Sequence, residues 1–179
     1  MLILLLTSIE QDIVNAYNSY KAVSSEILQY KRYKYFKEMT KIMVDAKGTV
    51  LYDLVNKIDK YELIRDYIPY EVVVSYDLDS KTAKAEIFFK GSKVGQEDVL
   101  FIFVSPYFII KNLILYGNQY GASYNIVENG NVINFTGIIG KFKIEAILNR
   151  NDYTIKSINY FKNDKKIIEI EYTNTQIVQ

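Results

Sequence analysis

The sequence predicts an α+β fold: an incomplete, half-open antiparallel β-barrel with an N-terminal helix and a second helix near the middle of the chain. Strand-like runs alternate with turn residues at intervals of about 8 to 12 residues, the spacing of an antiparallel sheet that curls. A helical repeat of apolar residues precedes these runs, and one long apolar segment divides them. No linker or internal repeat interrupts the chain, so we expect a single domain over residues 9–179.

Composition limits the functions open to the protein. Its 179 residues are 49% apolar and include 17 Tyr and 9 Phe, without Trp. Tyrosine suits half-buried strands because its ring packs while its hydroxyl reaches water. The 22 basic and 21 acidic side chains leave a net charge of +1, so no overall field favours nucleic acid as a partner. The near-equal numbers of basic and acidic side chains favour a small molecule or a protein as the partner.

The absence of two residue types narrows the chemistry further. Without His or Cys, the chain cannot build a Ser-His-Asp or Cys-His centre, or a zinc site with thiolate or imidazole ligands. Carboxylates, Lys, Tyr and Ser remain for catalysis. We therefore expect a protein that is not an enzyme, with no catalytic residue, no metal and no cofactor.

The N-terminal segment, residues 1–8, resembles the end of a secretory signal, because the apolar run 2–6 is closed by Thr7 and Ser8. No Lys or Arg precedes that run, so we expect a truncated signal; the alternative is the apolar start of the first helix. Nothing else approaches the roughly 18 apolar residues of a membrane span. We expect the mature protein to be soluble.

The first helix is predicted over residues 9–23, with Ser8 as its N-cap and acidic residues in the first turn. Apolar residues recur there at helical spacing, at Ile9, Ile13, Ala16, Tyr20 and Val23. Residues 26–45 interleave aromatics with Lys and Arg. That pattern is typical of a long strand with a basic solvent face, or alternatively of a strip that binds nucleic acid.

Turns and strands follow at short intervals. Residues 46–48 are predicted to form a hairpin turn, Pro69 to stand at the start of a strand, and residues 91–98 to form a polar loop. The other predicted strands are 49–55, 60–65, 70–76, 81–89, 123–128, 132–136, 141–148, 154–160 and 166–172.

The apolar segment 99–117 contains the second helix. Ser105 and Pro106 are a helix-start signal and Gly117 a C-cap, which predicts a helix over Pro106–Tyr116. A helix that is apolar nearly all round must be buried or must line a cavity. It is either an ordinary core helix or a lid over an apolar cavity.

Several stretches, in order, resemble the outer-membrane lipoprotein carriers, the LolA/LolB-like family. Residues 24–29 (SSEILQ) resemble its opening strand, and residues 48–52 its next hairpin. Residues 60–61, 68–71 (IPYE) and 72–77 (VVVSYD) are similar to its central strands, and residues 157–159 and 168–174 (IEIEYTN) to its last hairpin.

The sequence also departs from the family pattern. The family's Trp is Leu63 here, its strand arginine falls on Glu62 unless the strand slips to bring in Arg65, and Leu78 replaces a Gly. The arginine latch of the family's lid is therefore not assigned to a residue.

The resemblance implies a soluble, periplasmic carrier that shelters the acyl chains of lipoproteins on their way to the outer membrane. Implied partners are acylated lipoproteins, an inner-membrane releasing complex and an outer-membrane acceptor, and we expect a monomer. The absence of Cys favours the soluble carrier, because an acceptor that is itself a lipoprotein needs an acylated Cys.

Candidate site residues belong to the cavity wall and the lid. For the wall we choose one parity of the strands, although the opposite parity would exchange every assignment: Ile27, Tyr61, Leu63, Val72, Val74, Ile87 and Phe89. The lid helix would contribute Phe108, Ile109, Leu113 and Leu115.

Three alternatives remain open. The same half-barrel could sense a lipid or the state of the envelope without moving cargo. An enzyme could use Asp77 and Asp79, although a turn beside Ser80 and Lys81 is where acids are expected for local hydrogen bonds. Finally, a structural or adhesive β-protein could pack the apolar helix into a solid core.

Overall fold

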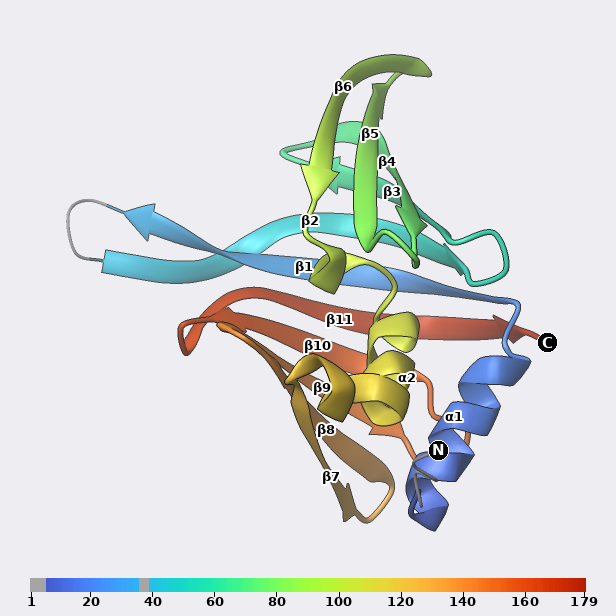
Figure 1. The fold of residues 1–179 in the computed structure, drawn as a ribbon. Helices are drawn as coiled ribbons and strands as arrows, with labels where there is room; N and C mark the ends of the chain where they lie inside the picture. The colour runs from blue at the N-terminus through green and yellow to red at the C-terminus, as the bar shows by residue number, and fades with distance from the viewer. Residues whose placement is uncertain (1–5, 36–38) are drawn as a thin grey trace.

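A single antiparallel sheet of eleven strands dominates the computed structural model, which describes residues 6–35 and 39–179 (Figure 1). The strand order is β6-β5-β4-β3-β2-β1-β11-β10-β9-β8-β7, so the sheet is open, with β6 and β7 at its edges. Two α-helices lie on the same face, and the sheet bends around them (Figure 1). The class is α+β.

The chain forms two meanders of neighbouring strands. The first comprises α1 (Ser8–Ser19), β1 (Ala22–Tyr35), β2 (Met39–Asp53), β3 (Ile58–Arg65), β4 (Ile68–Asp77), β5 (Thr82–Phe89) and β6 (Ser92–Val99). The chain then crosses to the opposite edge through the 3-10 helix η1 (Phe101–Phe103), α2 (Pro106–Tyr116) and the 3-10 helix η2 (Gly117–Tyr120). The second meander comprises β7 (Ser123–Asn129), β8 (Val132–Ile139), β9 (Phe142–Asn149), β10 (Ile155–Lys162) and β11 (Lys165–Val178).

The first and last strands join the two meanders. β1 pairs with β2 on one side and with β11 on the other, in a register that runs from Ala22 opposite Val178 to Lys31 opposite Ile168. This β1–β11 seam lies at the centre of the sheet (Figure 1). The most distant parts of the sequence thus form the middle of the fold.

Helix α1 begins one residue earlier than predicted, and its N-cap is Thr7 rather than Ser8. The Thr7 Oγ1 accepts from the Glu10 amide and the Glu10 carboxylate accepts from the Thr7 amide, which together form a capping box. The helix ends at Ser19, because the backbone at Tyr20 turns extended and leads into β1. Of the predicted signal segment, residues 1–5 lie outside the described part of the chain.

The prediction of one strand over residues 26–45 followed by a turn at 46–48 was wrong. β1 and β2 are two long paired strands, and residues 46–48 lie inside β2, opposite Gln29, Leu28 and Ile27. Gly48 has a different role there, because a Cβ atom on it would stand 1.9 Å from the Glu62 carbonyl oxygen of β3. The side chains of residues 32–44 lie outside the described part, so the basic face predicted there stays a prediction.

The predicted loop over residues 91–98 was also wrong, because Ser92–Val99 form the edge strand β6. Its partner β5 supplies the hydrogen bonds, while most of its side chains are polar and exposed. A polar edge strand lacks the apolar alternation by which half-buried strands are recognised.

The other elements lie close to their predicted positions. α2 spans Pro106–Tyr116 as predicted, the Asn129–Gly130 signal marks the β7–β8 turn, and Pro69 stands second in β4. Gly117 ends α2 in a right-handed conformation, and the left-handed position falls at Gly121 after η2. No helix among the described residues is both long and apolar enough to cross a bilayer.

The core lies between the helices and the face of the sheet that they cover. On that face, alternate strand residues from both meanders are buried, among them Val50, Val74, Phe135, Ile144 and Ile158. α2 fills the centre of this concavity, since Tyr107, Ile110 and Ile114 each retain at most 1% of their exposed surface. The apolar interior that the sequence predicts is thus present, and α2 occupies it.

Candidate functional site

An open groove of about 700 Å³ runs beside α2. Apolar side chains from four parts of the chain line much of it: Leu78, Phe101, Phe108, Leu113, Leu115 and Ile139. Asp79, Lys81 and Lys111 add charge. We call this space the α2 groove. Helix α2 therefore presents apolar side chains both to the sheet and to an accessible space.

All four residues predicted for the lid line the α2 groove. Ile109 and Leu113 are buried, whereas Phe108 and Leu115 are half-buried. The Phe108 ring packs on Tyr76 of β4 at a centroid distance of 6.0 Å, and Lys111 Nζ lies 5.2 Å from the Phe108 centroid. Burial lowers the pKa of Lys111 below its ordinary value.

The seven residues predicted for the cavity wall share one face of the sheet. The strand registers place Leu63 opposite Gly48 and Tyr70, Tyr61 opposite Val72, and Val72 opposite Ile87. Ile27 lies opposite Gly48, while Val74 and Phe89 follow by alternation. This is the face that packs against α2, since it carries Tyr52 and Tyr76, whose rings contact Tyr107 and Phe108.

These seven residues differ in exposure. Ile27, Leu63 and Val74 are buried, Tyr61, Val72 and Ile87 are half-buried, and Phe89 is 37% exposed. Apolar surface on the inner face of β4 and β5 is therefore left uncovered by α2. That surface, and not the central part under the helix, is open in this structure.

A glycine permits the close packing of α2 on β8. A Cβ atom on Gly137 would lie 2.6 Å from Leu113 Cδ1 and 3.1 Å from Phe135 Cε1, inside van der Waals contact. Leu113 therefore occupies the place that a side chain at position 137 would take. This contact was not foreseen from the sequence, because it joins residues from two distant elements.

Six tyrosines form a continuous layer beneath the start of α2. Ring centroids lie 5.1 Å apart for Tyr17–Tyr107 and 5.8 Å for Tyr52–Tyr107, and Tyr20, Tyr61 and Tyr172 extend the layer at 5.7 to 6.3 Å. Edge-to-face and tilted rings such as these stabilise one another beyond their burial. The tyrosine layer joins α1, α2 and the centre of the sheet.

Hydroxyl groups in the tyrosine layer are paired. Tyr52 and Tyr172 share a hydrogen bond of 2.8 Å, Tyr17 donates to the Tyr153 carbonyl at 3.0 Å, and the Tyr107 hydroxyl accepts from the Ile155 amide at 3.2 Å. Burial raises the pKa of Tyr20 to about 12 and that of Tyr52 further. These hydroxyls therefore stay neutral at physiological pH and act as fixed dipoles.

A buried carboxyl faces the N-terminus of α2. Asp59 of β3 has no exposed surface, and neither of its carboxyl oxygens makes a hydrogen bond within the described residues. Desolvation raises the pKa of Asp59 well above its ordinary value, while the nearby Ser105 amide and Tyr76 hydroxyl oppose that shift. The Tyr76 hydroxyl and the Ser105 Oγ are likewise buried without a hydrogen bond.

The sequence alone did not reveal this acid. The predicted strand begins at residue 60, so Asp59 falls outside it, and only the pairing of Asp59 with Tyr52 and Val74 turns its side chain toward the core. Its one detectable signal was parity, because Asp59 alternates with Tyr61 and Leu63, both predicted to face inward.

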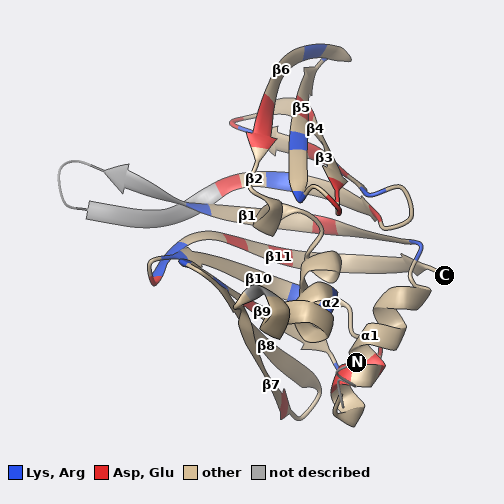
Figure 2. Cartoon of the chain, viewed as in Figure 1, with Lys and Arg blue, Asp and Glu red and all other residues tan. Residues whose placement is uncertain are grey.

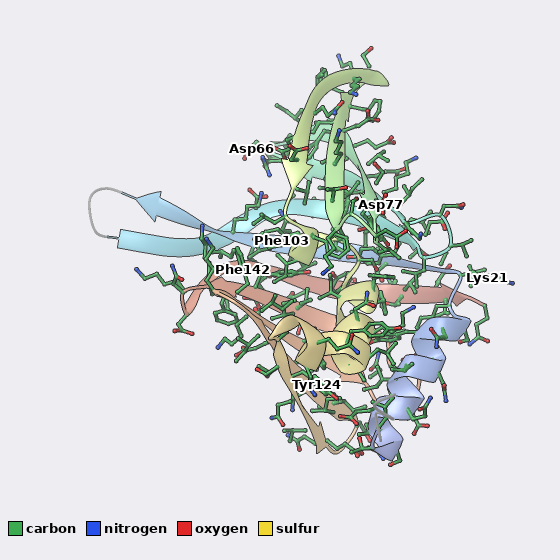
Figure 3. All side chains as sticks on the ribbon, viewed as in Figure 1. Lys21, Asp66, Asp77, Phe103, Tyr124 and Phe142 are labelled. Atoms are coloured by element: carbon green, nitrogen blue, oxygen red, sulfur yellow. The ribbon has the colours of Figure 1, made fainter. Side chains whose placement is uncertain are left out.

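Asp77 and Asp79, the alternative catalytic pair, occupy the β4–β5 turn. The Asp77 carboxylate accepts from the amides of Asp79 at 2.8 Å and Ser80 at 3.2 Å, an arrangement typical of a carboxylate that organises a turn. These backbone hydrogen bonds lower the pKa of Asp77. Figure 3 labels Asp77 and Asp66, which lie near opposite ends of β4.

Arg65, the strand arginine that a slipped register would bring in, binds away from the lid. Its Nη2 donates to Asp45 Oδ2 of β2 at 2.7 Å, and Gln29 Nε2 donates to the same oxygen at 2.8 Å. Lys31 Nζ lies 3.4 Å from it. Arg65 thus compensates the charge of the buried Asp45 carboxylate within the sheet.

A second groove, also of about 700 Å³, lies across β2 to β5 near the β3–β4 turn. Thr49, Glu62, Glu71 and Phe88, which line it, are successive cross-strand neighbours of opposite parity to the predicted wall. Glu62, Glu71 and Lys90 give this lining three charged side chains, as many as line the α2 groove. It lacks any residue of α2, the helix predicted to act as a lid.

Within the described residues, no group of three or more Asp and Glu side chains is placed to hold a metal ion.

Comparison with known proteins does not show a family for this chain. No protein-family model matches the chain, and no curated protein is significantly similar to it.

Proposed function

We propose that this protein binds acyl chains on the concave face of its sheet and carries lipid-modified cargo, as the resemblance to the LolA/LolB-like carriers implies. In this proposal the open sheet is a half-open barrel and α2 is its lid. The protein is a binding protein, not an enzyme.

One observation carries the proposal: α2 packs apolar side chains on the sheet and also presents Phe108, Leu113 and Leu115 to the accessible α2 groove, beside Lys111 and Asn112. A core helix of a soluble protein normally turns a polar face to solvent. α2 instead has only Lys111 and Asn112 as strongly polar residues, and Phe108 and Leu115 lie half-buried in the groove. An apolar ligand beside α2 would complete its burial.

The energy available from such burial is sufficient for tight binding. Each methylene removed from water contributes about 0.8 kcal/mol, so a chain of about ten methylenes contributes roughly 8 kcal/mol before the cost of ordering it. The uncovered surface of Val72, Ile87 and Phe89 offers a first contact, and further binding requires α2 to move aside.

Loading and release then depend on competition between the ligand and α2 for the same surface. In the closed state Ile110, Ile114 and Leu113 cover the inner face of the sheet. A ligand shifts this equilibrium only by its greater affinity for the open state. The tyrosine layer holds the first turn of α2 through Tyr107, so displacement of the later turns is the smaller change.

The proposal extends to location and partners as the resemblance implies them. The protein would act as a periplasmic monomer, receive acylated lipoproteins from an inner-membrane complex and deliver them to an outer-membrane acceptor. The alternative is a module with the same lipid site that senses a lipid or the state of the envelope and transfers nothing.

The test begins with the ligand. We expect the purified chain to bind a fluorescent fatty acid, and mass spectrometry of gently purified protein to detect acyl lipids. Phe108→Gln with Leu115→Gln should weaken binding at least tenfold, since these side chains line the α2 groove. Val127→Gln with Ile147→Gln, at exposed apolar positions outside it, should leave binding unchanged. Equal affinity in both double variants would refute the proposed site.

Transfer separates the carrier from the sensing module. Protein loaded with an acylated peptide is mixed with acceptor vesicles, and the peptide is followed into the vesicles. Transfer faster than spontaneous release supports a carrier, and tight binding without transfer supports the sensing alternative.

A further inference from the structure

The turns of this meandering sheet divide its charge between two ends. Antiparallel strands place alternate turns at opposite ends, so the turns 66–67, 90–91, 140–141 and 163–164 share one end. The turns 54–57, 78–81, 130–131 and 150–154 share the other. The near-neutral net charge hides how unevenly these ends are charged.

Counted with two residues on either side, the four turns that the structure describes at the first end carry eight Lys or Arg and two Asp. The four turns of the opposite end carry four basic and six acidic residues. One end of the sheet is therefore basic and the other weakly acidic. Figure 2 shows basic positions, in blue, at the turn that joins β10 to β11.

Five lysines concentrate the charge at one corner of the basic end. This lysine corner consists of Lys141 and Lys143 beside the β8–β9 turn and Lys162, Lys165 and Lys166 beside the β10–β11 turn. A hydrogen bond of 2.9 Å from the Asn163 amide to the Lys141 carbonyl holds the two turns together. The corner is therefore a fixed surface made from two separate hairpins.

Most of this charge is not neutralised within the protein. Lys143 lies 2.9 Å from Glu145, and Lys166 lies 3.0 Å from Glu169. Within the described residues, Lys141, Lys162 and Lys165 form no ion pair, and all three are exposed. Asp164 is the one acid within either turn.

Apolar side chains accompany the lysines. The ammonium groups of Lys143 and Lys166 lie 4.3 Å and 6.0 Å from the centroid of Phe161, which pairs with both residues across the strands. Ile138, opposite Lys143 in the register, is 45% exposed. Amines around an aromatic ring and an aliphatic side chain suit the boundary between lipid headgroups and acyl chains.

We propose that the lysine corner docks this protein onto an anionic lipid surface. Lysine acts as a mobile point charge and does not impose the bidentate geometry of arginine, which suits a diffuse layer of phosphate headgroups better than one defined acidic side chain. The choice of a lipid surface over an acidic protein rests on the proposed function, because a lipid carrier must approach a membrane.

The test measures binding of the full chain to vesicles. Phosphatidylcholine vesicles and vesicles with one part in three phosphatidylglycerol are sedimented with the protein at low and at physiological salt. We expect binding only to the anionic vesicles, weakened by salt. The triple variant K141Q/K162Q/K165Q should bind about fivefold more weakly per lysine removed, on the order of 100-fold in total.

A matched control removes the same charge elsewhere. In K57Q/K84Q/K156Q, three exposed lysines outside the lysine corner are replaced, so the net charge changes equally. This variant should bind like the unmodified chain. Equal losses in both triple variants, equal binding to the two vesicle types, or binding to polyglutamate but not to vesicles would each overturn the proposal.

Fatty-acid binding by the same preparations separates this proposal from the proposed function. The lysine variants should keep full affinity for the fluorescent fatty acid, because the corner lies outside the α2 groove. Acyl binding without vesicle docking refutes the docking surface alone, whereas docking without acyl binding refutes the carrier function alone.

Discussion

The Asp59 carboxyl is buried, and burial opposes its ionisation. The neighbouring groups compensate a negative charge there only weakly. Its oxygens lack hydrogen bonds, and its neighbours are the neutral hydroxyls of Tyr76 and Ser105, with Tyr61 and Tyr160 close enough to interact electrostatically. A neutral acid suits these surroundings better than a carboxylate. Because Ser105 precedes the first turn of α2, ionisation of Asp59 would disturb the point where the helix begins.

The protonation of Asp59 predicts how stability depends on pH. Below its ordinary pKa of 3.8, both folded and unfolded states keep the proton. As pH rises, the unfolded state ionises first, so the free energy of unfolding falls until pH passes the raised pKa of the folded state. Asp59→Asn should therefore stabilise the protein at pH 7 by about 1 to 3 kcal/mol and have little effect near pH 3.5.

Urea unfolding of both proteins at several pH values checks this expectation. Asp77→Asn is a control for which the expected change in stability has the opposite sign. The pKa of Asp77 is lowered in the folded state, so this substitution should destabilise the protein at pH 7 and lose its effect in acid. A difference between Asp59→Asn and the unmodified chain that stays constant with pH would contradict the buried neutral acid.

Gly48 is required by the approach of two strands. Gly48→Ala would bring Cβ to 1.9 Å from the Glu62 carbonyl oxygen, and backbone cannot rotate away as a side chain can. We expect a loss of about 3 kcal/mol or more in the free energy of unfolding, or no folded protein. Gly95→Ala is the matched control: its Cβ would lie 3.7 Å from Ile87, and we expect a change under about 1 kcal/mol.

At the scale of the element, the contact between α2 and β8 sets how firmly the helix is held. Gly137→Ala would push against Leu113 Cδ1, 2.6 Å from the new Cβ, and should cost about 1 to 2 kcal/mol of stability. Because the strain falls on the closed state, the affinity for a fluorescent fatty acid should rise several-fold.

A second substitution tests the direction of this effect. Leu113→Ala in the Gly137→Ala background removes the crowding, so the added strain should disappear relative to Leu113→Ala alone. A double-mutant cycle in unfolding and in fatty-acid affinity measures this coupling. Additive effects would show that the two residues do not act through one contact.

Most elements could be predicted because their signals are local. Pro106 and the apolar run after it predict α2, and Asn129–Gly130 predicts the β7–β8 turn. The failures at residues 46–48 and 91–98 have nonlocal causes. Gly48 is explained by a neighbouring strand and not by a turn, and β6 owes its position to pairing with β5, not to apolar side chains.

The candidate site was predictable to the extent that it follows strand parity. Alternation placed Tyr61, Leu63 and Val72 on one face, and the registers bring them together. Alternation does not show which residues of that face α2 covers, so the exposure of Phe89 could not be foreseen, and parity alone indicated that Asp59 faces inward. The tyrosine layer escaped prediction because its members come from five elements and one helix cap.

At the scale of the whole molecule, ligand binding should change amide hydrogen exchange in one part and leave it unchanged in another. If an acyl chain replaces α2, amide hydrogen exchange in α2 should accelerate on addition of a fatty acid, while the β1–β11 pairing is protected as strongly as before. Mass spectrometry of deuterium uptake with and without ligand measures both regions in one sample. Slower exchange throughout α2 would mean that the ligand binds without displacing the helix.

The β1–β11 seam also dictates an order of events during synthesis. Strand β1 must wait for a partner that starts at Lys165, so a ribosome must have made the chain past that residue before the middle of the sheet can form. Until then Val23 and Ile27 have no neighbour on that side, and the edge of β1 that β11 covers stays unpaired. Arrested nascent chains ending before Lys165 should therefore be cleaved by protease within β1, whereas chains that include β11 should resist cleavage there.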